Sequence, residues 1–343
     1  MKAAILVQQH APLVVAELDL PPLGVGQVLV RVMYSGICGK QLDEISGRRG
    51  DDPYLPHLLG HEGAGVVAAV GPGVRKVKPG DHVVLHWMKG TGIEALPPQF
   101  RWQDTVVNAG PVTTFSEYTV VAENRVTPIA ADVPLDVACL LGCAVPTGLG
   151  IVFHDAALQP GQSIAVFGVG GVGLNVIQGA ALVNAYPIVA VDLYEHKLAW
   201  AQHFGATHGV NAGSGDPYVQ LRRLSCGQGF DVTVDTTGHA AVRALAYRLT
   251  STAGKTILAG VPALGEPLCI DSFPLHFGRQ LRGSHGGGTQ PDRDIPRYVQ
   301  LYQRGKLKLA EQITHRYRLE EINAAIATVQ RGEASRCVLV MAP

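Results

Sequence analysis

Two cysteines and one histidine, each beside a glycine, could bind a metal ion. They are Cys38, His61 and Cys143. Two thiolates and one imidazole, with a fourth position left open, are a usual ligand set of catalytic zinc. Such a zinc polarises a carbonyl or lowers the pKa of a bound alcohol, as hydride transfer requires. Each residue taken singly also fits a small core cysteine or a histidine in a turn, so spacing alone leaves the metal site open.

A glycine-rich run in the middle of the chain predicts a dinucleotide site. The apolar, β-prone segment 163–167 precedes it, and segment 174–184 after it has a helical pattern. Strand, glycine turn and helix are the context in which a GxGxxG motif binds a pyrophosphate at the helix N-terminus. The first glycine allows the tight turn, the second lets the backbone approach the phosphates, and the third lets helix and strand pack closely. The predicted cofactor contacts are Gly168, Gly170, Gly171, Val172 and Gly173.

Asp192 ends the next predicted strand, residues 187–191. A carboxylate in this place accepts hydrogen bonds from the ribose 2′- and 3′-hydroxyls and repels a 2′-phosphate. The sequence therefore predicts NAD as the cofactor rather than NADP.

The elements that must position these residues fall into two patterns. The first third has short β-like runs broken by Gly and Pro, at 27–32, 65–70, 81–85 and 115–121, which is typical of a partly closed antiparallel domain. From about Leu140 helices alternate with apolar strands, which indicates a doubly wound parallel sheet. The tail, residues 313–340, returns to a strand, an amphipathic helix at 319–330 and a final strand. The predicted class is α/β, with a β-rich domain beside a Rossmann sheet.

Composition excludes several classes of function. The 343 residues carry 28 basic and 28 acidic side chains, and no block of like charge suggests nucleic acid or a membrane surface as partner. No apolar run is long enough to span a bilayer, and the N-terminus has no signal-peptide pattern. Six scattered cysteines form no disulfide framework. We expect a cytoplasmic protein with a small-molecule substrate.

Several motifs together resemble the zinc-dependent medium-chain alcohol dehydrogenases. The motifs are GHEGAG at 60–65, VGPGV at 70–74, KPGD at 78–81, TFSEY at 114–118, CLLGC at 139–143 and the glycine run at 168–173. The resemblance covers nearly the whole chain. It implies a GroES-like catalytic domain from residues 1–144 and 287–343, and a Rossmann NAD-binding domain from residues 145–286.

The resemblance also assigns roles to individual residues. Cys38, His61 and Cys143 match the catalytic zinc ligands, and Glu62 matches a carboxylate that can transiently bind the metal. The remaining matches are Thr147 beside the nicotinamide, Asp192 and Lys197 on the adenosine ribose, Arg336 on the pyrophosphate, and Trp87 in the substrate pocket.

The cysteines of the family's structural zinc site are missing. The stretch after His86 contains no cysteine, so we predict one zinc per chain. The loop 88–112 must then be held in another way, and we expect packing around Trp87, Phe100 and Trp102.

The family's proton relay is altered as well. Lys40 stands where a Ser or Thr is usual, Asp43 replaces the distal histidine, and Gln41 replaces an Asp behind the zinc histidine. Lys40 could be the acid/base itself, with its pKa lowered by the metal. It could instead bind an acidic group of the substrate, or it could pair with Asp43 or Glu44 and take no chemical part. We expect the Gln41 carbonyl to orient His61.

These residues predict an NAD- and zinc-dependent alcohol dehydrogenase that acts on a polar or functionalised alcohol, with Lys40, Asp43 and Glu62 as candidate catalytic groups. The altered relay leaves open a lyase or epimerase that uses NAD transiently or not at all. A non-catalytic nucleotide-binding relative is a further alternative. By resemblance we expect a homodimer or homotetramer that pairs through the last Rossmann strands, near residues 268–273.

Overall fold

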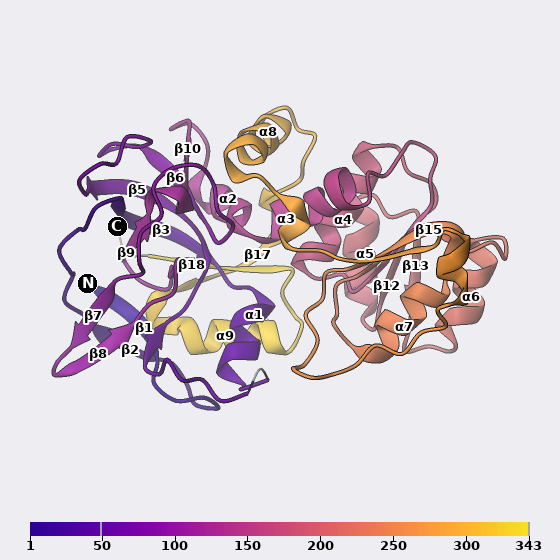
Figure 1. The fold of residues 1–343 in the computed structure, drawn as a ribbon, viewed down its shortest axis with the longest axis horizontal. Coiled ribbons are helices and arrows are strands. Elements are labelled where there is room, and N and C mark those ends of the chain that lie inside the picture. Colours follow the sequence, from indigo (N-terminus) through magenta and orange to yellow (C-terminus); the bar gives the residue numbers. More distant parts are fainter. Residues whose placement is uncertain (49, 342–343) are drawn as a thin grey trace. The chain divides into compact units, whose positions relative to one another are not determined.

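The computed structural model describes residues 1–48 and 50–341 and contains two compact units (Figure 1). Met1–Cys143 and Gln290–Pro343 form unit 1, and Ala144–Thr289 form unit 2. The first and last segments of the chain therefore fold together. Among the described residues no single helix is long and apolar enough to cross a membrane. The helical segments Leu135–Gly142 and Ala144–Asp155, which meet at a bend, reach that length and apolar composition only when they are counted together.

Unit 1 is built around two β-sheets. The larger has the strand order β10-β6-β5-β3-β18-β17, and β9 also pairs with β3. In β3 and β18, Ser35 lies opposite Leu339 in antiparallel register, so the C-terminal segment completes a sheet that the N-terminal segment begins. The bounds of its strands are β3 (Gln27–Gly36), β5 (Glu62–Val70), β6 (His82–His86), β9 (Tyr118–Ala122), β10 (Val126–Ile129), β17 (Ile313–Arg318) and β18 (Arg336–Val340).

The smaller sheet has the order β2-β1-β4-β8-β7. Its buried side chains, which include Ile5, Leu58 and Phe100, form a core of their own, and Trp102 packs against it. Its strands are β1 (Lys2–Leu6), β2 (Val14–Glu17), β4 (His57–Leu58), β7 (Gln99–Trp102) and β8 (Thr105–Asn108). The helices of unit 1 include α1 (Gly39–Ile45), α2 (Leu135–Ala138), α8 (Pro291–Gln303) and α9 (Ile322–Gln330).

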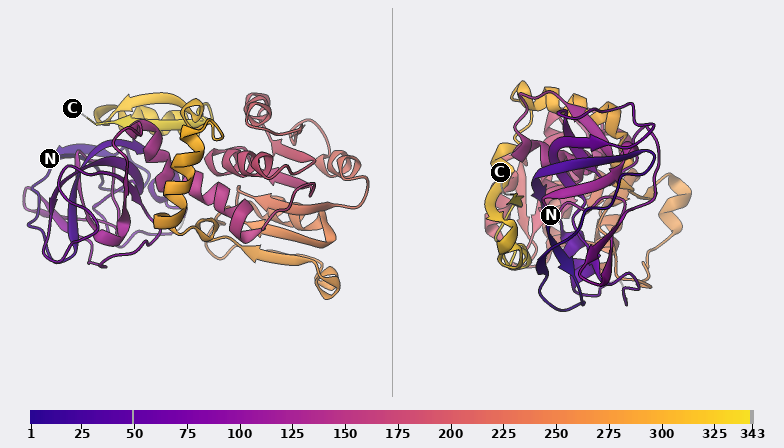
Figure 2. Two further views of the ribbon diagram at one scale, coloured as in Figure 1. Left: turned by 90° about the horizontal axis from the view of Figure 1, so that it is seen from above. Right: turned by 90° about the vertical axis from the view of Figure 1, so that its left-hand side faces the viewer.

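Unit 2 is a doubly wound parallel sheet, as the alternating pattern predicts. Alternate residues of β11 enter separate cores: Ile164 and Val166 pack with α4 and α5, whereas Ala165 and Phe167 pack with α6 and α7. The ribbon of this unit shows the helices beside the sheet (Figure 2). The strand order is β13-β12-β11-β14-β15-β16. The elements are β11 (Ile164–Phe167), α4 (Gly171–Leu182), β12 (Ile188–Asp192), α5 (Glu195–His203), β13 (His208–Asn211), α6 (Pro217–Leu224), β14 (Phe230–Asp235), α7 (Ala240–Arg248), β15 (Thr250–Leu258) and β16 (Gln280–Gly283).

The last strand of this sheet lies later in the chain than expected. Residues 268–272 have no regular structure, and a single 3₁₀ segment occupies Phe273–Phe277. The sheet ends instead with β16, Gln280–Gly283. The prediction of a strand near 268–273 is therefore wrong, because β16 is a short edge strand with largely exposed side chains and has no apolar run to mark it.

Two carboxylates, one buried and one half-buried, hold the loop that follows β6. Glu123 accepts hydrogen bonds from the backbone N–H groups of Arg75, Lys76 and Ile93, at 2.6, 2.7 and 2.8 Å. Asp292 of α8 accepts from the backbone N–H and the hydroxyl of Thr91, at 2.5 and 2.8 Å. The expected packing of Phe100 and Trp102 is found, but hydrogen bonds to carboxylates fix the first part of the loop.

We expect the Glu123 carboxylate to contribute strongly to the free energy of unfolding through its hydrogen bonds to this loop. Burial raises its pKa, but the three backbone donors outweigh burial and hold the pKa below its usual value. In Glu123→Gln the new amide N–H₂ faces a donor, and charge-assisted hydrogen bonds worth about 1.5–3 kcal/mol each are lost. We expect the free energy of unfolding to fall by about 2–4 kcal/mol in urea titrations. Glu94→Gln is the matched control, because Glu94 is 46 % exposed in its ion pairs with Lys89 and Arg125 and exposed carboxylates of this kind contribute less than about 1 kcal/mol per pair. Equal losses in both variants would contradict this role.

Candidate metal and cofactor sites

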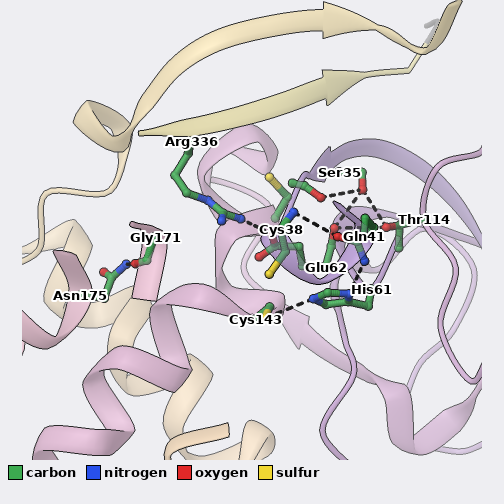
Figure 3. A network of polar contacts seen from close by, with 12 residues as sticks. Ser35, Cys38, Gln41, His61, Glu62, Thr114, Cys143, Gly171, Asn175 and Arg336 are labelled. Atoms are coloured by element: carbon green, nitrogen blue, oxygen red, sulfur yellow. Dashed lines mark hydrogen bonds and ion pairs between the residues drawn. The ribbon is translucent and has the colours of Figure 1, made fainter. Parts of the chain in front are cut away.

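Three elements of unit 1 bring the predicted metal ligands together. Cys38 is the N-cap of α1 after β3, His61 precedes β5, and Cys143 follows the 3₁₀ segment Cys139–Gly142. The sulfur and nitrogen atoms of the three side chains all lie within 4.8 Å of one another (Figure 3). Gly60 permits this placement of His61: its φ is +90°, and an added Cβ would lie 2.5 Å from Oγ1 of Thr114.

The charges of these side chains suit a soft cation. A hydrogen bond between the thiols of Cys38 and Cys143 holds the pKa of Cys38 well below its usual value and that of Cys143 well above it, and burial adds to the rise at Cys143. Burial lowers the pKa of His61, but the hydrogen bond and negative charge of Cys38 outweigh it and raise the pKa. His61 Nε2 lies 3.2 Å from the Cys143 sulfur. The site thus concentrates sulfur-centred negative charge, and its Cys₂His donors fit zinc.

Glu62 forms a buried ion pair that the motifs did not reveal. Its Oε1 contacts Nη2 of Arg336, and both side chains are buried (Figure 3). Burial raises the pKa of the Glu62 carboxyl, and the Arg336 guanidinium opposes that shift. Gly36 leaves room for the pair, because an added Cβ would lie 2.7 Å from Glu62 Oε1. The guanidinium assigned by resemblance to the pyrophosphate is therefore held by Glu62, 274 positions earlier in the chain.

The residues of the altered relay lie on α1. The ammonium group of Lys40 forms an ion pair with Glu44, one helical turn away, and the Lys40 side chain is 43 % exposed. Asp43 lies 3.5 Å from the guanidinium of Arg48. Of the three alternatives for Lys40, this contact favours pairing with Glu44.

Gln41 lies behind His61 but in a different orientation from the one expected. Its Oε1 accepts a hydrogen bond from the Cys38 N–H at 3.1 Å, and its Nε2 contacts Nδ1 of His61. The prediction that the Gln41 carbonyl faces His61 is therefore wrong. The carbonyl caps the first turn of α1 instead, a contact between residues three apart that offers the Cys38 N–H an acceptor.

The glycine turn of unit 2 has the geometry of a phosphate cradle. Gly168 follows β11 with a φ of +89°, and a Cβ added to Gly173 would lie 2.0 Å from the Gly168 carbonyl oxygen. A Cβ added to Gly170 would meet nothing within 4 Å, so the chain leaves space beside this residue. Gly171 and Val172 begin α4, where Asn175 donates to the Gly171 carbonyl at 2.7 Å (Figure 3). The turn and helix N-terminus therefore fit a pyrophosphate.

Asp192 ends β12, and Lys197 lies in α5, the helix that follows β12. Asp192 Oδ2 accepts from the backbone N–H of Val169 at 2.7 Å, and Oδ1 accepts from that of Leu193 at 2.8 Å. These bonds fix the carboxylate against the glycine turn. Lys197 places its ammonium group 5.0 Å from the centre of the Tyr194 ring.

Thr147 lies in α3 (Ala144–Gly150), where a second glycine turn packs against it. A Cβ added to Gly287 would lie 2.4 Å from the Thr147 carbonyl oxygen. Trp87 follows β6 in unit 1 as a half-buried residue, and its carbonyl accepts from the Arg125 guanidinium.

Comparison with family models finds two matches in the chain. Residues 24–131 match the alcohol dehydrogenase GroES-like domain, and residues 171–304 match the zinc-binding dehydrogenase domain. The chain is 36 % identical to an alcohol dehydrogenase class-3 of Cereibacter sphaeroides, with 99 % of both chains covered. It is 34 % identical to an S-(hydroxymethyl)glutathione dehydrogenase of Paracoccus denitrificans, again with 99 % of both covered.

Solved structures give the same picture. The alcohol dehydrogenase zinc-binding domain protein of Burkholderia ambifaria superimposes with a TM-score of 0.91 at 29 % identity, covering 100 % of this chain and 99 % of that one. The benzyl alcohol dehydrogenase of Acinetobacter calcoaceticus gives 0.90 at 28 % identity, with 99 % of each chain covered.

Proposed function

The chain belongs to the zinc-dependent medium-chain alcohol dehydrogenases, and we propose that it transfers a hydride between a polar or functionalised alcohol and NAD. The observation that carries this proposal is the buried group of Cys38, His61 and Cys143, with their ligand atoms within 4.8 Å of one another. Unit 1 would serve as the catalytic domain and unit 2, with its glycine turn, as the NAD domain.

Cys38, His61 and Cys143 would hold the zinc, and Glu62 would be a transient fourth ligand. When bound, zinc acts as a Lewis acid that stabilises negative charge on an oxygen atom. The chain's own residues prepare the site: Gln41 and the turn at Gly60 orient the ligands, and Arg336 neutralises the Glu62 carboxylate. Trp87, directly after β6, would line the substrate side.

In unit 2 the turn Gly168–Gly173 would take the pyrophosphate at the N-terminus of α4. Asp192 and Lys197 would bind the adenosine ribose, and Thr147 would lie beside the nicotinamide. The Asp192 carboxylate supports NAD over NADP, because its charge disfavours a 2′-phosphate.

We also propose a homodimer or homotetramer. Among the described strands β16 pairs only with β15, so one edge of the sheet is open. The neighbouring segment exposes Leu264, Phe273 and Phe277, which are 82, 66 and 59 % exposed. An open strand edge beside exposed apolar side chains is a typical subunit contact.

The proposal is tested by NADH formation from a panel of substrates, with bound zinc and NAD measured in the same protein. The panel holds neutral alcohols, polyols and acidic hydroxy compounds, and S-(hydroxymethyl)glutathione belongs to the last group because relatives are named for it. NADH formation from polyols or acidic hydroxy compounds supports the proposal, whereas turnover of neutral alcohols alone supports the redox function but not the substrate class. If zinc and NAD are bound and no compound yields NADH, the redox function is refuted and the lyase or epimerase alternative is favoured.

The same panel tests Lys40. Because its ammonium group pairs with Glu44 at the surface, Lys40→Met is expected to change kcat/KM by less than about fivefold, since an exposed pair contributes below about 1 kcal/mol. Lys89→Met, which removes an exposed lysine paired with Glu94, is the matched control. A large loss with every substrate would make Lys40 the proton carrier, and a loss with acidic substrates alone would make it a substrate anchor. Asp43→Asn is measured alongside, because Asp43 occupies the distal relay position.

A further inference from the structure

The Gln41 carboxamide has two neighbours that each need a hydrogen-bond acceptor. The Cys38 N–H donates to Gln41 Oε1 at 3.1 Å, and among the described residues this oxygen is the acceptor found for that N–H. On the other side, Gln41 Nε2 contacts His61 Nδ1. Gln41 is buried, 1 % exposed, so water does not readily replace either partner.

The tautomer of His61 decides what Gln41 must supply. His61 Nε2 is the nitrogen that points toward the sulfurs, 3.2 Å from Sγ of Cys143. A neutral imidazole that binds a metal through Nε2 carries its proton on Nδ1, and a ligand histidine normally donates that N–H to an acceptor. In the structure the Gln41 N–H₂ faces Nδ1. An N–H₂ group can only donate, so Nδ1 must act as the acceptor and the proton of a neutral ring must then lie on Nε2.

Turning the carboxamide does not remove this conflict. If Oε1 turns to accept from His61 Nδ1–H, the N–H₂ group faces the Cys38 N–H and the cap of α1 is lost. If Oε1 stays on Cys38, the N–H₂ group faces Nδ1–H. One carbonyl oxygen cannot serve two donors on opposite sides of the amide, whereas the two oxygens of a carboxylate can.

We infer that Gln41 is a positioning residue that lowers the affinity of the Cys38–His61–Cys143 site for zinc, because its single carbonyl oxygen cannot accept from both Cys38 N–H and His61 Nδ1–H. This inference rests on the zinc site of the proposed function. It makes the metal of this enzyme more readily exchanged than it would be with a carboxylate at position 41.

Gln41→Glu supplies the second acceptor at nearly the same size. The purified full-length protein is stripped with a chelator, and zinc affinity is measured by competition with the colorimetric chelator 4-(2-pyridylazo)resorcinol. We expect the variant to bind zinc about 10–100-fold more tightly than the wild type, the size of other changes in groups that orient ligand histidines. Zinc release to the same chelator is expected to slow in parallel.

The added negative charge needs its own control. Lys40→Met changes the net charge by the same one unit, and the Lys40 charge is close enough to influence His61, but its ammonium group pairs with Glu44 and not with a ligand. A gain in Gln41→Glu well above that in Lys40→Met supports the inference. A gain no larger than that of Lys40→Met overturns it, because charge alone would then account for the effect.

Two further readouts distinguish a variant that fails to fold, a protein that binds no zinc and an inference that is wrong. If Gln41→Glu does not fold without metal, the zinc concentration at which its Tm begins to rise reports the same affinity. An onset at a concentration no lower than that of wild type overturns the inference. Absence of zinc from both wild type and variant would overturn the zinc site itself, and the inference with it. Zinc in both at equal affinity would overturn the inference alone.

Discussion

Cys38→Ser is expected to lower kcat/KM by about a thousandfold, because a Lewis-acid metal contributes several kcal/mol and each 1.36 kcal/mol is a factor of ten. The Cys38 sulfur lies within 4.8 Å of the ligand atoms of His61 and Cys143, so Cys38 supplies one of the two thiolates of the site. A serine hydroxyl is a much poorer ligand for zinc than a thiolate. Zinc content by mass spectrometry and NADH formation with a good substrate measure the two effects together.

Cys139→Ser is the control for this substitution. Cys139 lies four residues before Cys143 and is also buried. Its thiol donates to the Asp136 carbonyl at 3.0 Å, and the metal-ligand group does not include it. We expect Cys139→Ser to keep its zinc and to retain kcat/KM within a factor of a few. Unchanged turnover in Cys38→Ser would refute the assigned ligand, and equal zinc loss in both variants would mean that the damage is general.

Arg336→Met is expected to lower the free energy of unfolding of unit 1 by about 3–5 kcal/mol, the cost of leaving one partner of a buried ion pair without its counterion. Glu62 is fully buried, and Arg336 is the guanidinium in contact with it. Trp87 and Trp102 belong to unit 1 and Trp200 to unit 2. The substitutions are therefore compared in a Trp200→Phe background, in which the change of tryptophan fluorescence during urea unfolding follows unit 1.

A second substitution separates charge from packing. Glu62→Gln combined with Arg336→Met removes the unpaired carboxylate, so the double variant is expected to recover part of the lost stability. Arg316→Met is the surface control, because its ion pair with Asp136 is 48 % exposed on the arginine side and is worth less than about 1 kcal/mol. An Arg336→Met protein as stable as Arg316→Met would contradict the importance of the pair.

Local features of the fold could be predicted from the sequence, whereas contacts between distant segments could not. Strand β11, the glycine turn and helix α4 follow one another without a break in the chain. The spacing of the glycines from 168 to 173 therefore identifies the turn from sequence alone. The Glu62–Arg336 ion pair and the hydrogen bonds to Glu123 join segments that lie far apart in the chain. No sequence motif links such segments, so these contacts could not be predicted. Cys38, His61 and Cys143 were assigned together only through resemblance, because three different elements bring them close.

The orientation of Gln41 shows a different limit. The resemblance to the family implies its position behind His61, but the choice between its oxygen and nitrogen depends on the Cys38 N–H as well. A helix cap and a ligand contact compete for one atom. Strand β16 could not be predicted either, because its side chains are mostly exposed and form no apolar pattern.

The pairing of β18 with β3 determines which of the two units can finish folding first during synthesis. Residues 144–289 hold all six strands of their own sheet and can close as soon as they are synthesised. The first 143 residues must wait for Arg336–Val340 before their sheet is complete and before Glu62 meets its counterion. During that interval Tyr34, Ser35 and Gly36 of β3 lack the strand they pair with, and an unpaired strand edge makes the unfinished domain prone to misassembly.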